Sequence, residues 1–247
     1  MSKPSIIAVI PARYQSSRFL GKPLVDIGGK SMIQRVYEQA QKSNRLSKVI
    51  IATDDHRIQQ HAQAFHAEVI MTKEHPNGTS RSWEAIEKSV SKADFILNIQ
   101  GDEPFIEPAQ IDQLCDALNP SIEIATMAKK ISDLPTLFDP NTVKVVFNKQ
   151  HRALYFTRST IPYCRDTAKQ AYLQKTNFYK HIGIYAYQYD VLSKLVKLKA
   201  SSLEEAECLE QLRWIEHGFD IQMVCTDYES IGIDTPEDIK KVSHLIK

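Results

Sequence analysis

The stretch "VIPARYQSSRFLGKPL", residues 9–24, joins the end of an apolar run to a basic loop. The apolar run over 6–10 gives way to a proline, and the loop then carries Arg13, Arg18 and Lys22. In an open α/β sheet, ligands bind beyond the carboxyl ends of the strands, near the point where the strand order reverses. The stretch therefore predicts a buried strand followed by a ligand-binding loop at the edge of such a sheet.

Strand and helix patterns alternate from this point onward. Short β-rich runs such as "KVIIAT" and "EVIM" are separated by amphipathic segments such as "MIQRVYEQAQKS". This order predicts an α/β fold with a mostly parallel, Rossmann-like sheet flanked by helices on both faces. The expected strands lie at 5–10, 48–53, 68–71 and 94–100, and the expected helices lie at 32–43, 56–65 and 80–91.

Residues 122–187 have a different pattern, with more strand and more turn signals, including "DPN". We interpret this region as an antiparallel excursion attached to the sheet. Two helices, at 189–198 and 202–218, a strand at 220–226 and a terminal helix from Thr235 complete the chain. Without repeats or low-complexity linkers, the sequence predicts one domain over 1–247.

Composition excludes several classes of protein. Thirty-one Lys and Arg face thirty Asp and Glu, so no global basic charge favours nucleic acid. The sequence has no membrane-spanning apolar stretch and no signal-peptide pattern, which predicts a cytoplasmic protein without membrane insertion. Cys115, Cys164, Cys208 and Cys225 are widely spaced, which predicts reduced thiols in the core and excludes a cysteine-based zinc site.

The basic loop suits a polyphosphate ligand. Arg13, Arg18 and Lys22 supply positive charge, and Gly21 allows the backbone to approach closely. An ordinary solvated surface loop is the alternative. Neither common phosphate motif is present: a Walker A pattern ending at Ser31 would need its first glycine at the position of Leu24, and no G-x-G-x-x-G opens the first helix.

Two carboxylates are expected near this loop. Asp102 follows the strand in "ILNIQGDEP" and so lies at the same sheet edge. In "GIDTPEDI", Thr235 is the expected N-cap and Asp238 completes a capping box, which leaves Asp234 available for another role. Carboxylates beside a polyphosphate predict a bridging Mg²⁺, although both aspartates could also be ordinary turn residues.

Seven motifs together resemble the 3-deoxy-manno-octulosonate cytidylyltransferase family, also called CMP-Kdo synthetases. They occur in order and at similar spacing over nearly the whole chain. They are "IPARYQSSRFLGKPL", "NGTSR", "QGDEP", "YFTRSTIPY", "HIGIYAY", "LEQLRWIEHG" and "GIDTPEDI".

The resemblance implies a nucleotide-diphospho-sugar transferase type of sheet and a defined reaction. CMP passes from CTP to the anomeric hydroxyl of 3-deoxy-D-manno-octulosonate (Kdo), and pyrophosphate is released, for lipopolysaccharide biosynthesis. The implied enzyme is a homodimer that uses Mg²⁺. Exposed edges in the excursion at 122–187 independently favour a dimer, because a second copy of the chain is the simplest cover for them.

The resemblance also implies roles for individual residues. Lys22, Asp102, Asp234 and Arg13 would be catalytic, and Asp102 and Asp234 would bind the metal. CTP would be bound by Arg13, Arg18, Lys22, Gly78 and Arg81. The sugar would be bound by Gln100, Arg158, His181, Tyr185, Glu210 and Gln211. Kdo offers one carboxylate for an arginine and several hydroxyls for the other groups.

The sugar-binding residues also have structural interpretations. Tyr185 could pack in the core, His181 could end a strand, and Glu210 and Gln211 could lie on a solvated helix face. Two residues depart from the family pattern: Leu20 replaces a common proline, and Ser80 replaces a common acidic residue. Losing the proline should raise the entropic cost of ordering the loop around CTP.

Alternative functions remain open at this level. A related enzyme could activate another acidic ketosugar, such as 8-amino-Kdo or sialic acid, because the phosphate half of the site would be the same. A nucleotide-binding module without turnover would need to lack one of the expected charged residues, and all are present. A GT-A glycosyltransferase usually has a D-x-D pair, which "GDEP" does not supply.

Overall fold

The computed structural model describes residues 3–15, 19–89, 91–229, 231–242 and 245. The sheet holds nine strands in the described chain, and its main path has the order β3-β2-β1-β4-β8-β5-β9. The strands are β1 (Ile6–Ala12), β2 (Lys48–Thr53), β3 (Glu68–Met71), β4 (Phe95–Asn98), β5 (Ile124–Lys130), β6 (Lys144–Phe147), β7 (Ala153–Thr157), β8 (Tyr179–Gln188) and β9 (Ile221–Thr226).

Most strands of the main path run in the same direction. Strand β1 pairs in parallel with β2 and β4, and β5 pairs in parallel with β9. Strand β8 runs antiparallel between β4 and β5. The predicted mostly parallel α/β sheet is therefore confirmed, with one reversed strand near its centre.

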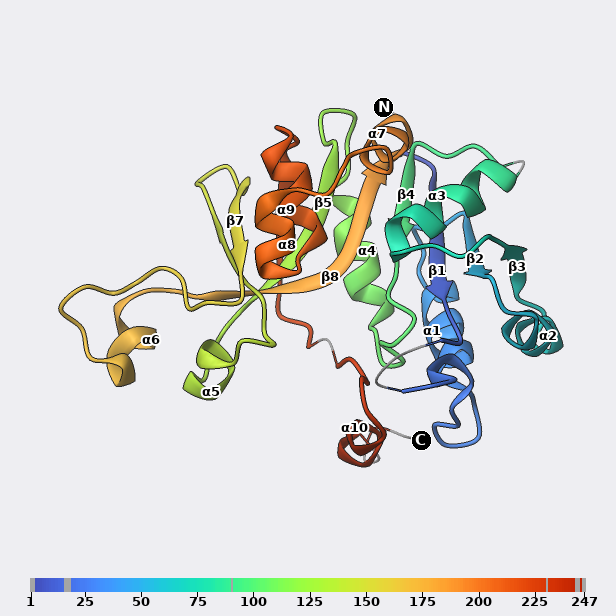
Figure 1. The fold of residues 1–247 in the computed structure, drawn as a ribbon, viewed down its shortest axis with the longest axis horizontal. Coiled ribbons are helices and arrows are strands. Elements are labelled where there is room, and N and C mark those ends of the chain that lie inside the picture. The colour runs from blue at the N-terminus through green and yellow to red at the C-terminus, as the bar shows by residue number, and fades with distance from the viewer. Residues whose placement is uncertain (1–2, 16–18, 90, 230, 243–244, 246–247) are drawn as a thin grey trace.

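The helices lie on opposite faces of this sheet, as Figure 1 shows. On one face, α1 (Met32–Gln41), α2 (His56–Ala64) and α4 (Pro108–Asp116) contribute to one apolar cluster. On the other face, α3 (Gly78–Lys88), α7 (Tyr189–Leu195) and α9 (Glu210–Glu216) contribute to a second cluster. The short helices α5 (Leu134–Phe138) and α6 (Tyr172–Lys175) belong to the region that leaves the sheet.

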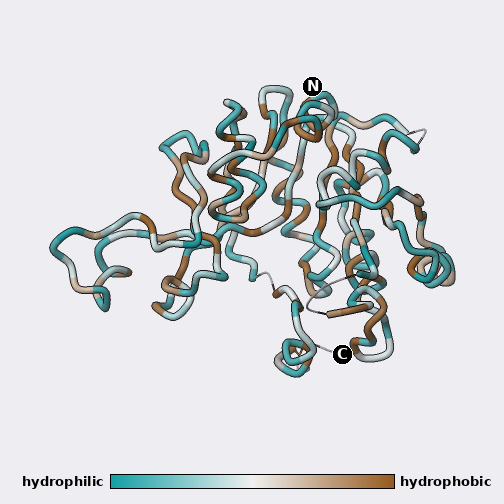
Figure 2. The backbone as a smooth tube through the Cα atoms, viewed as in Figure 1, coloured by the Kyte–Doolittle hydropathy of each residue, from teal (hydrophilic) through white to brown (hydrophobic). Residues whose placement is uncertain are grey.

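Strand β1 connects the two clusters because successive side chains of a strand point to opposite faces. Ile6, Ala8 and Ile10 belong to the first cluster, and Ile7 and Val9 belong to the second. All five are buried, which explains why the strand is continuously apolar. Figure 2 shows hydrophobic residues gathered along the central strands and hydrophilic residues along the outer loops.

Only part of the stretch 122–187 leaves the main sheet. Strand β5 and most of β8 lie within it, whereas β6 and β7 form an antiparallel pair that joins the sheet through β8. The segment between β7 and β8 extends away from the body of the molecule together with α6 (Figure 1). Sequence patterns show strands but not their partners, so the excursion is smaller than its expected bounds.

The helix expected at 202–218 is two helices, and the prediction of one helix was wrong. Helix α8 (Ser202–Glu207) ends at Cys208, whose φ of 52° lies in the left-handed region. The buried Leu209 follows, and α9 begins at Glu210. The break directs the first residue of α9 toward the start of α3, as described below.

The C-terminal segment packs against the start of α1. Ile233 and Val242 form a small cluster with Ile27 and Met32, and the Ile233 amide donates to the carbonyl oxygen of Asp102 at 2.9 Å. Helix α10 (Pro236–Lys241) begins with the predicted capping box of Thr235 and Asp238. Among the described residues, none of the helices has the length and apolarity to cross a membrane. All four cysteines are free thiols, but only Cys115 and Cys164 are buried, so the prediction of core positions was wrong for Cys208, which is exposed at the end of α8, and for Cys225, which is partly exposed.

Candidate active site

A cavity opens at the carboxyl edge of the sheet, between the loop after β1, the turn after β4 and the start of α3. Its lining combines cationic, acidic and amide side chains from distant parts of the sequence. Seven of the residues expected to act in the site lie on it: Arg13, Lys22, Gly78, Arg81, Gln100, Asp102 and Asp234. Arg18, which was also expected to bind CTP, lies outside the described residues.

Lys22 is held between two carboxylates in this cavity. Its Nζ donates to Asp102 Oδ2 at 2.8 Å and to Asp234 Oδ1 at 2.9 Å. The Lys22 side chain is only 12% exposed, whereas those of Asp102 and Asp234 are 34% and 48% exposed. The two carboxylates therefore share one cation and still present their surfaces to solvent.

The loop around Lys22 is shaped by glycine. Gly21 has a φ of 70°, which glycine adopts without strain, and it precedes the short 3-10 turn Lys22–Leu24. A Cβ atom at this position would lie 3.1 Å from the Tyr14 ring. The guanidinium carbon of Arg57, a residue of α2, lies 3.3 Å from the centroid of the same ring. Tyr14 thus anchors the loop to the body of the fold.

The donor set at Lys22 fits a hard divalent cation. Asp102 and Asp234 supply exposed carboxylate oxygens, and Mg²⁺ is typically held by one or two carboxylates together with substrate phosphates. In the described chain, no cluster of three or more His, Cys, Asp or Glu side chains could hold a metal alone. The two aspartates therefore fit a metal that arrives with its phosphate ligand.

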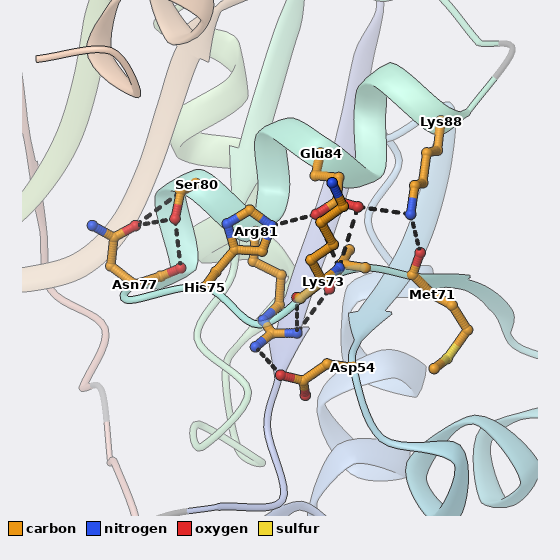
Figure 3. A network of polar contacts seen from close by, with 10 residues as sticks. Asp54, Met71, Lys73, His75, Asn77, Ser80, Arg81, Glu84 and Lys88 are labelled. Carbon is orange, nitrogen blue, oxygen red and sulfur yellow. Dashed lines mark hydrogen bonds and ion pairs between the residues drawn. The ribbon is translucent and has the colours of Figure 1, made fainter.

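Helix α3 begins at the cavity and is fixed by polar contacts that include those of the buried Arg81 (Figure 3). Arg81 is 3% exposed, and its guanidinium donates to Asp54 Oδ2 at 2.9 Å and to Thr72 Oγ1 at 2.8 Å. Arg81 therefore lines the cavity while its strongest contacts are to protein groups. A Cβ atom at Gly78 would approach Pro11 Cγ to 3.0 Å, so this helix start packs tightly against β1.

His75 is a residue of this cavity that the sequence did not indicate. It is hydrogen-bonded through Nε2 to Glu84, which also accepts from Lys88 and from the Lys73 amide (Figure 3). Burial alone would raise the pKa of Glu84, but these hydrogen bonds outweigh it and lower the pKa to about 2. Glu84 is therefore ionised at neutral pH and fixes the orientation of the His75 ring.

The residues expected to bind sugar lie mostly outside the lining of this cavity. Gln100 connects the two regions because its Nε2 donates to the carbonyl oxygen of Gly183 on β8 at 2.9 Å. His181 and Tyr185 flank Gly183, with their ring centroids 5.3 Å apart. Thr126 Oγ1 lies 3.0 Å from His181 Nε2. Burial lowers the pKa of His181 to about 3, so the ring is neutral at physiological pH.

Glu210 and Gln211 stand at the start of α9. Gln211 is buried, and Glu210 accepts hydrogen bonds from Asn77 Nδ2 and Thr79 Oγ1, each at 2.9 Å. Burial raises the pKa of Glu210 to about 7, which the hydrogen bond from Thr79 opposes. The expectation that Glu210 could lie on a solvated helix face is therefore not met.

Arg158 is held away from this group, beside α8. Its backbone amide donates to the Glu207 carboxylate at 2.9 Å, and its Nε donates to the Glu207 carbonyl oxygen at 2.8 Å. The fully buried Lys144 donates to the carbonyl oxygen of Arg158 at 2.6 Å. Neither Lys144 nor Glu207 was singled out from the sequence. The partners of Lys144 are backbone carbonyl oxygens, which no sequence motif marks, and the partners of Glu207 lie 49 and 50 residues away.

An α/β sheet with a cavity of cations and paired carboxylates at its carboxyl edge defines a phosphate-binding transferase type of site. The family model described as Cytidylyltransferase matches residues 7–224. The chain belongs to the cytidylyltransferase family, in its group of 3-deoxy-manno-octulosonate cytidylyltransferases.

Two curated relatives and one solved structure illustrate this similarity. The 3-deoxy-manno-octulosonate cytidylyltransferase of Cytophaga hutchinsonii is 51% identical, with 98% of each chain covered. The protein of the same name from Parabacteroides distasonis is 50% identical, with 95% of each chain covered. The structure of CMP:2-keto-3-deoxy-manno-octonic acid synthetase complexed with CTP matches with a TM-score of 0.90, 43% identity and 98% of each chain covered.

Proposed function

We propose that this chain transfers CMP from CTP to the anomeric hydroxyl of Kdo and releases pyrophosphate. The observation that carries the proposal is the full-length similarity to enzymes of that name, combined with the cavity that gathers Arg13, Lys22, Asp102 and Asp234. Neither the similarity nor the cavity suffices alone, because one fold can have many functions and the function depends on the residues of the site.

The cavity would hold the nucleotide. Arg13 and Lys22 would contact the phosphates as cationic donors, and Arg18 is proposed to join them. Gly78 would bring the backbone at the start of α3 close to the nucleotide, and the buried Arg81 would support that wall through Asp54. CTP binding by these residues rests on their common place in the cavity and on the motifs that carry them.

Asp102 and Asp234 would hold Mg²⁺. When bound there, the ion would neutralise charge on the phosphate oxygens and so favour attack at phosphorus. Without a divalent cation, a triphosphate that drew Lys22 away would leave two carboxylates beside its own negative charge. The arrangement of Lys22 therefore supports a metal requirement.

The sugar side of the site would include Gln100, His181 and Tyr185 around Gly183. Arg158 is the arginine proposed for the sugar carboxylate, and Glu210 and Gln211 would bind hydroxyls from the start of α9. The neutral His181 can act as one donor and one acceptor but not as a counter-ion for the carboxylate. That task would remain with Arg158.

The reaction would be a direct displacement. The anomeric oxygen of the sugar forms a bond to the α-phosphorus, the bond from that phosphorus to the bridging oxygen breaks, and pyrophosphate leaves on the opposite side. The hydroxyl proton passes to solvent. The residues would contribute mainly by positioning both substrates and by stabilising charge on the phosphoryl oxygens, so no covalent intermediate with the chain is required.

A pyrophosphate-release assay tests the proposal. The wild-type chain is supplied with CTP, Mg²⁺ and one acidic ketosugar at a time: Kdo, 8-amino-Kdo or sialic acid. We expect Kdo to give the highest kcat/KM. A clear preference for another ketosugar would overturn the substrate assignment, and no release with any of them would favour a binding module without turnover.

A homodimer and a cytoplasmic location are also part of this proposal. The apolar Leu154 on β7 is 56% exposed, and Tyr163 in the segment after β7 is 80% exposed. Large apolar side chains as exposed as these two are candidates for contact with a partner. A second copy of the chain is the partner proposed for them.

A further inference from the structure

Glu210 joins the start of α9 to the start of α3. Its Oε1 accepts from Asn77 Nδ2 at 2.9 Å, and its Oε2 accepts from Thr79 Oγ1 at 2.9 Å. These residues are more than 130 positions apart in the sequence. Each carboxylate oxygen has a different donor, so the orientation of the carboxylate is fixed as well as its position.

The Asn77 amide is itself held in one orientation, as Figure 3 shows. Its Oδ1 accepts from the Ser80 amide at 2.9 Å and from Ser80 Oγ at 2.7 Å. The first of these bonds makes Asn77 the N-cap of α3. Because the oxygen of the amide faces the helix, its nitrogen must face the other way, toward Glu210.

Asn77 also occupies a boundary between two hollows of the surface. It lines the cavity that contains Lys22 and Asp102, and it lines a neighbouring hollow that contains Glu210 and Arg213. The Asn77 side chain thus contacts α3 through its oxygen and the start of α9 through its nitrogen.

We infer that Asn77 is a positioning residue that orients Glu210 for the sugar while capping the helix that borders the nucleotide. The inference rests on the proposed function and extends it by a residue that acts through another. Ser80 is the second part of the device, because its hydroxyl donates to Asn77 Oδ1. An acceptor-only side chain at position 80 would remove this second bond and leave the backbone amide of residue 80 as the donor to Asn77 Oδ1.

The test separates the two ends of Asn77. Asn77→Ser retains an oxygen that can cap α3 but loses the amide nitrogen that donates to Glu210 Oε1. Asn77→Asp retains the cap and places a second carboxylate beside Glu210. We expect the KM for the sugar to rise about tenfold in Asn77→Ser, since the Glu210 carboxyl group loses one of the two donors that fix its orientation. The rise should be larger in Asn77→Asp. In Asn77→Ser, which adds no charge to the cavity, the KM for CTP should change less than about threefold.

Asn148→Asp is the matched control. Asn148 also accepts backbone hydrogen bonds through Oδ1, from Gln150 and Arg152, and it is not part of the lining of either hollow. This variant changes the same chemical group elsewhere and should leave both KM values unchanged.

A double-variant cycle tests whether Asn77 acts through Glu210. If it does, adding Asn77→Ser to Glu210→Ala should raise the sugar KM less than about twofold beyond Glu210→Ala alone, because Glu210→Ala already removes both acceptor oxygens. Multiplicative effects of the two changes, or an unchanged sugar KM in both Asn77 variants, would overturn the inference. Equal rises in both KM values would also overturn it, since they indicate a general change at the helix start.

The wild-type chain distinguishes failure of this inference from failure of the proposed function. Turnover of Kdo by the wild type supports the proposed function whatever the Asn77 variants do. If the wild type prefers another ketosugar, the same KM comparison is made with that sugar. If no ketosugar supports turnover, both the proposed function and the inference fall.

Discussion

The ammonium group of Lys22 lies 2.8 Å from the carboxylate of Asp102, eighty residues further along the chain. One residue belongs to the loop after β1 and the other to the turn after β4, and these two strands are parallel neighbours. Parallel strands end at the same edge of a sheet, so their following loops meet there. The first strand-and-loop unit is thereby linked to the acidic turn that would bind metal.

Replacing either carboxylate that is proposed to hold Mg²⁺ should remove most activity without unfolding the chain. In Asp102→Asn and Asp234→Asn, we expect kcat to fall roughly a hundredfold or more, because each loses the negative charge that would hold Mg²⁺. The assay is pyrophosphate release at saturating Mg²⁺, with circular dichroism to verify folding. Glu87→Gln, an exposed carboxylate change on α3, serves as the control. Near-normal turnover in both aspartate variants would refute the assignment.

Removing the Lys22 charge should affect the nucleotide more than the sugar. In Lys22→Ala, we expect the KM for CTP to rise about tenfold or more, because a charge-assisted contact to phosphate is lost. The exposed Lys30, which pairs with Glu38, provides the control variant Lys30→Ala. A rise confined to the KM for the sugar would show that the loop had been assigned to the wrong substrate.

His181 should remain neutral throughout the physiological pH range. Burial lowers its pKa from 6.5 to about 3, so the folded chain binds fewer protons at this site than the unfolded chain below pH 6.5. The free energy of unfolding should therefore decrease as the pH falls from about 6.5 toward 3. His181→Gln should lose less stability over that range than the wild type, as measured by urea unfolding at several pH values.

The matched change His56→Gln, at an exposed helix position, controls for the loss of a histidine from the chain. Ring-selective NMR gives a second measurement. A His181 resonance that titrates between pH 6 and 7 would contradict the expected behaviour.

Lys144 should stabilise the β6–β7 pair and the Arg158 backbone. Its buried ammonium donates to the carbonyl oxygens of Asp139, Thr142 and Arg158 at 2.9, 2.7 and 2.6 Å. In Lys144→Met these three acceptors lose their donor, and we expect a loss of about 3 kcal/mol in the free energy of unfolding. The measurement is urea unfolding, with the exposed change Lys149→Met as control. An unchanged midpoint would contradict this role.

Light scattering during size exclusion tests the proposed dimer. One chain has a mass of 28.2 kDa, and we expect roughly twice that mass at micromolar protein concentration. Leu154→Lys would place a charge on the exposed apolar surface of β7, and it should shift the mass toward that of one chain. A wild-type mass near 28.2 kDa would refute the dimer.

Local sequence determined the early strands, their helices and the caps of those helices. Strand β1 could be predicted because five consecutive apolar residues are typical of a buried strand. The cap of α10 could be predicted because Thr235, Pro236 and Asp238 are residue types that are common at these positions of a helix start. The position of Asp102 at the carboxyl edge of the sheet could also be predicted, because the residue directly follows a strand. These features depend on residues within a few positions of one another.

Only the tertiary structure decided which distant groups meet. Sequence patterns did not reveal that β8 would be inserted between β4 and β5, or that a left-handed residue at Cys208 would end α8 and start α9 at Glu210. The contacts of Glu210 with Asn77 and Thr79 depend on where α9 packs and on which residue begins it. Such contacts form when the helices pack on the faces of the sheet. The local preferences of a segment do not determine which distant residue will lie beside it.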